Sequence, residues 1–232
     1  MKHTLLFSIL VFIFITLINA QVKDTSKRDV HPVCELEGRK GLKFGMSFEE
    51  TRNVYLDRQF QTIDDMLLAL EPGLTEEELR KMMDEDAINS FLNIHSTSFA
   101  GNNATGSLMF SNNRLYSFLY TFEIETSNNN KYIDIYYDLK GLLSKKYGDP
   151  TNTSEYLSYP YEEDFPRGNH AGQAVSVGKG KYGSFWVCPT NKKSVILGLT
   201  GDNYEMSLVL IYSDNSFDIS EEEKLSEELE DF

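Results

Sequence analysis

The sequence predicts an α+β fold in which helices pack on one face of a twisted antiparallel sheet. Three observations support this prediction. Apolar residues alternate with a period of two over residues 116–124, as in a half-buried strand. Residues 132–147 instead carry apolar side chains at helical spacing. After Pro150, short strand-like segments are separated only by brief turns, which favours antiparallel pairing over parallel units.

The chain divides by composition into four parts. Residues 1–20 have a basic start, an apolar middle and a small residue before polar sequence begins, which is typical of a secretory signal peptide. Residues 21–40 are polar and irregular, residues 41–213 form the predicted single α+β domain, and residues 214–232 form an acidic tail. We therefore expect cleavage after Ala20 and a secreted or periplasmic protein without a membrane span. An uncleaved anchor is the alternative.

Charge argues against one class of partner. The formal net charge of the chain is −14, and acids concentrate in residues 214–232. An acidic body repels phosphate backbones, so nucleic acid is not expected to bind. The tail itself is expected to be solvated, with a short exposed helix that begins near Ser220 as the alternative.

Cys34 and Cys188 are the two cysteines of the chain. In an exported protein a single pair is a candidate disulfide. This bond would join the entry segment to a strand near the other end of the predicted domain. Two buried free thiols are the alternative.

Three helices are predicted, and the first two begin with a capping-box spacing. Ser47 precedes Glu50 by three residues, and Thr75 precedes Glu78 in the same way. The third helix ends before Gly148, which suits a helix C-cap. The three predicted ranges are 47–60, 74–88 and 132–147.

Eight segments have strand character, three before the last helix and five after it. Asn112-Asn113 is typical of a tight hairpin turn between two of them. The predicted strands are 91–94, 105–111, 116–124, 154–159, 173–177, 182–188, 194–199 and 205–212.

Two short motifs resemble those of small exported bacterial proteins. The residues FGMS at 44–47, with acids two and three positions later, resemble a start motif, and KYGDP at 146–150 resembles a helix end. With the single Trp186, they are similar to the group of β-lactamase-inhibitor-protein-like folds and outer-membrane assembly lipoproteins of the SmpA/OmlA type. The resemblance implies helices on an antiparallel sheet, allows two similar halves, and implies protein binding rather than catalysis. The chain lacks the lipobox cysteine of the lipoproteins and the paired disulfides of the inhibitors.

Aromatic residues provide the candidate binding surface. Tyr156, Tyr159 and Tyr161 lie beside acids and two prolines in the stretch EYLSYPYEEDFP. Flat tyrosines near carboxylates suit a protein partner or a sugar ring, whereas packing in a β-rich core is the alternative explanation. Together with Trp186 they are the candidate binding residues, and residues 160–172 form the loop that we expect to make the contact.

The sequence contains no familiar catalytic or metal-binding pattern. His31, His95 and His170 lack the close spacing of zinc ligands, and neither a P-loop nor a G-x-S-x-G pattern occurs. We therefore expect no metal, cofactor or enzymatic activity, and predict a binding module for another protein or a cell-envelope component. A carbohydrate-binding accessory protein is the alternative. A hydrolase with paired carboxylates is a further hypothesis.

Overall fold

The structure is a computed structural model. Every described residue belongs to one compact unit, His31–Phe232. The described residues are 32–39, 41–54, 60–61 and 91–217.

Several predictions concern residues outside these ranges. They are the signal peptide over 1–20, the irregular segment up to residue 31, the end of the first helix, the helix over 74–88 and the tail beyond Phe217.

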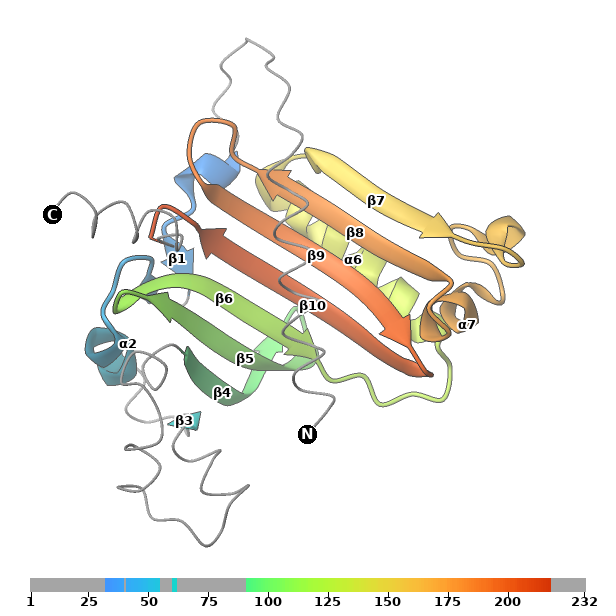
Figure 1. Cartoon of the computed structure of the whole chain (residues 1–232), viewed down its shortest axis with the longest axis horizontal. Helices are drawn as coiled ribbons and strands as arrows, with labels where there is room; N and C mark the ends of the chain where they lie inside the picture. Colours follow the sequence, from blue (N-terminus) through green and yellow to red (C-terminus); the bar gives the residue numbers. More distant parts are fainter. Residues whose placement is uncertain (1–31, 40, 55–59, 62–90, 218–232) are drawn as a thin grey trace, which may run out of the picture. The chain divides into compact units, whose positions relative to one another are not determined.

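The main sheet consists of two meanders that meet in its middle. Its strands are β3 (Phe60–Gln61), β4 (Phe91–Phe99), β5 (Asn102–Ser111), β6 (Arg114–Phe122), β7 (Asn152–Leu157), β8 (Gly180–Val187), β9 (Lys193–Asp202) and β10 (Glu205–Asp214). Among the described residues these eight strands pair antiparallel in the order β3-β4-β5-β6-β10-β9-β8-β7 (Figure 1). The order is symmetric about the β6–β10 pair, so the sheet has two four-stranded halves.

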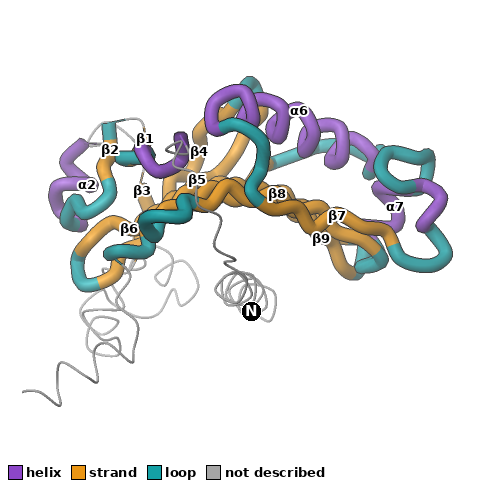
Figure 2. The backbone as a smooth tube through the Cα atoms, turned by 90° about the horizontal axis from the view of Figure 1, so that it is seen from above, coloured by secondary structure: helices purple, strands orange, loops and turns teal. Residues whose placement is uncertain are grey.

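Helix α6 (Asn130–Tyr147) connects the two halves and packs on the sheet. Figure 2 shows α6 and the short α7 (Ala171–Ser176) along the same face of the sheet. This arrangement confirms the predicted α+β fold and the predicted third helix. The buried side chains of α6 are Ile133, Ile135, Tyr136, Leu139, Leu143 and Tyr147.

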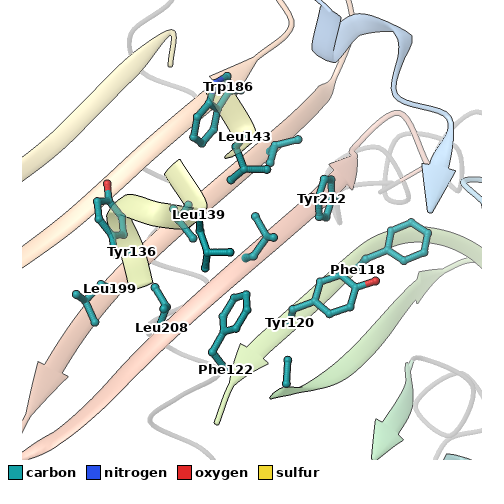
Figure 3. Packing of buried hydrophobic residues seen from close by; sticks show 14 of the residues in the cluster. Phe118, Tyr120, Phe122, Tyr136, Leu139, Leu143, Trp186, Leu199, Leu208 and Tyr212 are labelled. Atoms are coloured by element: carbon teal, nitrogen blue, oxygen red, sulfur yellow. The ribbon is translucent and has the colours of Figure 1, made fainter. Parts of the chain in front are cut away.

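The strand pattern of β6 explains why one face of the sheet becomes the core. Phe118, Tyr120 and Phe122 are two residues apart, so they point to the same face, and each is nearly inaccessible to solvent. Figure 3 shows them on the side of the sheet that also holds Leu139 of α6 and Leu208 of β10. The apolar residues that alternate with a period of two in the sequence are therefore those that point to the face covered by α6.

The start of α2 (Phe48–Val54) has the predicted capping box. The backbone N–H of Glu50 donates to Ser47 Oγ (3.2 Å), and the backbone N–H of Ser47 donates to the Glu50 carboxylate (2.8 Å). The preceding turn is hydrogen bonded to the start of β6, since the N–H of Gly45 donates to the carbonyl of Leu115 (2.8 Å).

The predicted strand over residues 173–177 is wrong, because these residues belong largely to α7. A short apolar run has no period that separates a strand from a helix. Its conformation depends on α6, where Asn130 Oδ1 accepts a hydrogen bond from the N–H of Gly172 (2.7 Å). A Cβ at Gly172 would collide with the backbone of Asn129, so the close approach requires glycine.

Short elements cover the same face near the middle of the sheet. They are the 3-10 helix η1 (Pro32–Glu35) and the two-stranded hairpin of β1 (Gly38–Arg39) and β2 (Leu42–Lys43). Cys34 in η1 and Cys188 after β8 lie at disulfide-bonding distance, as the sequence predicts. The bond joins η1 and the hairpin that follows it, which we call the N-terminal cover, to the C-terminal half of the sheet. No helix among the described residues is both long and apolar enough to cross a bilayer.

Candidate functional site

Residues 158–170 form the candidate site, and we call this segment the Tyr159 loop. It follows the edge strand β7 and leads into α7. The side chain of Tyr159 is 80% exposed and that of Phe165 is 42% exposed, although both are large and apolar enough to favour burial. Tyr156, on β7 just before the loop, is 47% exposed.

The other predicted binding residues have different surroundings. Tyr161 is partly buried and packs against the core. Trp186 is fully buried in β8, and its indole N–H donates to the carbonyl of Gly148 (2.8 Å). In this position the ring of Trp186 has no face open to a ligand, so we leave it out of the site. The structure therefore groups Tyr156 and Tyr159 at the surface and separates Trp186 from them.

The Tyr159 loop is held by side chains from α6 and β8. The ring of Tyr182 stacks on Phe165 with centroids 6.1 Å apart, and its hydroxyl donates to the carbonyl of Pro166 (2.8 Å). The side-chain amide of Asn130 donates to the carbonyls of Gly168 (3.3 Å) and Asn169 (3.0 Å). These bonds tie the loop backbone to the regular elements beneath it, so Tyr159 projects from a supported segment.

A second support is internal to the loop. The Asp164 carboxylate accepts a hydrogen bond from the backbone N–H of His170 (3.1 Å), and the N–H of Gly168 donates to the Asp164 carbonyl (2.5 Å). The peptide bonds before Pro160 and Pro166 are both cis. His170 thus contributes its backbone to the fold of the loop, and its side chain is exposed.

A polar cluster around Glu155 lies under the start of the loop, between α6, β7 and β8. The Glu155 carboxylate accepts hydrogen bonds from the hydroxyls of Tyr136 (2.8 Å) and Tyr137 (3.2 Å) and forms an ion pair with Lys140. Tyr136 and Ser184 share a hydrogen bond of 2.7 Å. The side chains of Lys140 and Glu155 are 21% and 12% exposed, so the pair is shielded from water.

Burial strengthens the preference of the phenols in this cluster for their protonated form. It raises the pKa of Tyr136 and of Tyr137, and the Glu155 charge raises both further. Burial, with a smaller contribution from Glu155, raises the pKa of Tyr182 to about 12. Tyrosine is protonated at neutral pH in any case, so the raised pKa values mean that all three phenols remain hydrogen-bond donors into the alkaline range. The cluster has the properties of a structural network that stabilises the junction of α6 and β7.

The cluster does not match the hydrolase hypothesis. Acid–base hydrolysis of glycosides needs two carboxylates placed on either side of a reacting bond, whereas Glu155 is the one carboxylate hydrogen bonded within the cluster. Within the part of the chain that the structure describes, no group of three His, Cys, Asp or Glu side chains is arranged to hold a metal ion.

Sequence reasoning included two residues of the site in the predicted loop but did not single them out. Phe165 lies in the aromatic stretch that the sequence singled out, directly after the 3-10 helix η2 (Glu162–Asp164), and its position in the sequence does not indicate that it is exposed. Arg167 lies with its guanidinium 3.9 Å from the centroid of the Tyr137 ring. This contact joins the loop to α6 across 30 residues of sequence, and no local spacing indicates it.

Comparisons with protein-family models, with curated proteins and with solved structures gave no match. The resemblance described above therefore stays a prediction.

Proposed function

We propose that the protein is an exported, non-enzymatic binding module that contacts another protein or a cell-envelope component through the Tyr159 loop. One observation carries the proposal: Tyr159 is 80% exposed on a segment whose backbone is hydrogen bonded to α6 and β8. Exposed aromatic side chains are common anchors in protein interfaces. A loop that is already ordered loses little entropy when it binds.

The cysteine pair supports the exported location. Cys34 and Cys188 lie at disulfide-bonding distance, and such bonds form and persist in oxidising compartments. The bond also joins elements that are 154 residues apart in sequence, so it would help a chain to stay folded outside the cell interior.

Carbohydrate binding is the second candidate function. Sugar rings stack on open aromatic faces, and Tyr159 offers the most exposed ring of the three candidate tyrosines that line this region. Tyr156 is less suitable because the ammonium group of Lys181 lies 5.5 Å from the centroid of its ring. A glycan ligand would therefore depend mainly on Tyr159.

The proposal is tested by using three immobilised proteins to capture binding partners from a cell-envelope extract. The three proteins are the wild type, Tyr159→Ala, and Tyr204→Ala as the matched control. Tyr204 is 78% exposed, almost as much as Tyr159, but lies in the turn between β9 and β10. We expect quantitative mass spectrometry to show a partner that is retained by wild type and Tyr204→Ala and lost with Tyr159→Ala.

The same three proteins on a glycan array separate the two functions. A specific glycan signal that disappears only with Tyr159→Ala favours the carbohydrate alternative. Identical capture by all three proteins, together with identical array signals, would show that the Tyr159 loop is not the contact surface.

A further inference from the structure

A pocket lies on the helix-covered face of the sheet, away from the Tyr159 loop. Its volume is about 420 Å³, within the range of small-molecule sites. The β1–β2 hairpin contributes Arg39, β4 contributes Phe99, and the last turns of α6 contribute Leu142, Leu143 and Lys146. The loop is bonded to Asn130 at the opposite end of α6, about 24 Å from Lys146 along the helix axis.

Arg39 lies among three aromatic rings of the sheet. Its guanidinium carbon is 4.0 Å from the ring centroid of Phe99, 4.9 Å from that of Tyr120 and 5.1 Å from that of Tyr212. Its Nη1 donates to the hydroxyl of Tyr212 (2.8 Å). The cation thus lies over three rings, and its N–H groups are its hydrogen-bonding surface.

The hydrogen-bonding capacity of Arg39 exceeds what the described residues use. A guanidinium has five N–H donors, and the buried Nε of Arg39 has no acceptor among the described residues. No carboxylate of the described residues forms an ion pair with Arg39 or with Lys146. Because Arg39 is partly buried, an anionic group of a ligand would lower the cost of burying its charge.

Charge and polarity together define the ligand. The chain has a formal net charge of −14, yet this pocket is lined by two cations, and its other walls include Phe99, Leu142 and Leu143. An anionic group would be attracted to Arg39 and Lys146, and an apolar body would cover the remaining walls. Arginine matches the planar geometry of a carboxylate.

We propose that this pocket binds a carboxylic acid that carries an apolar chain or ring. The carboxylate contacts Arg39 and Lys146, and the apolar part lies against Phe99, Leu142 and Leu143. The site is independent of the Tyr159 loop, so it can exist whether or not that loop binds a partner.

Isothermal titration calorimetry with three probes of equal chain length tests the charge requirement. The probes are decanoate, decanol and decylammonium. Decanoate should bind about ten-fold more tightly than the other two. Raising the ionic strength from about 0.01 M to about 1 M should weaken the binding of decanoate, because the Debye length falls from about 30 Å to about 3 Å. Decanol binding should not respond in this way.

Two lysines at the end of α6 provide a matched pair of variants. Lys146 lines the pocket, and Lys145 is an exposed neighbour outside its lining. Lys146→Gln should weaken decanoate binding about five-fold, whereas Lys145→Gln should leave it unchanged. Arg39→Lys should weaken it further, since the ammonium keeps the charge but not the planar donor edge. Circular dichroism would show that the lysine variants remain folded.

Several results would overturn the proposal. Equal binding of decanoate and decanol would show that no carboxylate site exists. A dissociation constant for decanoate above about 1 mM would show that Arg39 has a structural role only. Equal losses in Lys145→Gln and Lys146→Gln would indicate general attraction to the helix end. None of these results bears on capture by the Tyr159 loop.

Discussion

The two halves of the sheet share one strand topology but have different covers on the same face. An 18-residue helix, α6, lies over the C-terminal half, and its Tyr136 and Leu139 are fully buried. Near the β6–β10 pair the cover is a hairpin whose strands have two residues each, and η1 packs against β8, β9 and α6. The pocket with Arg39 lies where the hairpin meets the last turns of α6. An accessible site therefore remains where the long cover ends and the short one begins.

Loss of the disulfide should have the largest effect, because it releases the smaller cover. Replacing Cys34 and Cys188 by serine together should lower the free energy of unfolding by about 5 kcal/mol, since the bond closes a loop of 154 residues. Denaturant unfolding followed by the fluorescence of Trp186, the single tryptophan, measures this change. The reduced wild type should match the variant. A loss below about 1 kcal/mol would mean that the N-terminal cover is held by its own packing.

Two leucines of α6 compare its buried side with its pocket side. Leu139 is fully buried and Leu142 is 45% exposed. Leu139→Ala should cost about 3 kcal/mol because it leaves a cavity against the sheet, whereas Leu142→Ala should cost less than about 1 kcal/mol. Both variants replace leucine by alanine within the same helix, so the change in helix propensity is the same. The difference between their free energies of unfolding in urea therefore measures the loss of packing. Equal losses would show that the pocket side of α6 is packed as tightly as its core side.

Alkaline pH should weaken the C-terminal half through its buried phenols. Below pH 10 tyrosines are protonated in both folded and unfolded chains. Above pH 10 the unfolded chain releases phenolic protons, while the folded chain retains that of Tyr182 until about pH 12. The folded state then binds more protons, so the free energy of unfolding falls as pH rises through this window. Tyr136 and Tyr137 extend the fall in the same direction.

Tyr182→Phe is the variant that isolates this effect. It removes one titrating phenol, so urea denaturation at several pH values between 10 and 12 should give a shallower decline than in the wild type. Parallel curves for the two proteins would show that Tyr182 ionises equally easily in the folded and unfolded chains.

Much of the fold could be predicted from periodicity, since each regular element must bury one side. The alternation around Phe118 predicted β6, and the apolar stripe through Leu139 and Leu143 predicted α6. The segment 173–177 was assigned wrongly because its helix depends on a hydrogen bond from Gly172 to Asn130. That bond joins residues 42 positions apart, so no local sequence pattern indicates it.

The candidate site could be predicted only in part. Acids and prolines around Tyr159 indicated a surface loop, and the structure places Tyr159 at the surface. Composition cannot distinguish a ligand-binding tryptophan from a core one, and Trp186 is buried. Arg39, Phe99 and Tyr212 come together only through the pairing of distant strands. The sequence offered one signal for this pocket. It was the pair of basic residues between two glycines, GRKG at 38–41, in a chain that is acidic as a whole.

The pairing of β6 with β10 has a consequence for biosynthesis. Tyr120 and its partner Leu210 are 90 positions apart, and β10 ends at Asp214. A ribosome delivers the first meander long before this strand, so the edge of β6 has no neighbour while about ninety further residues are made. An unpaired edge is a template for association with other chains. If the first meander folds before β10 is available, shielding of the β6 edge by a chaperone would prevent such association.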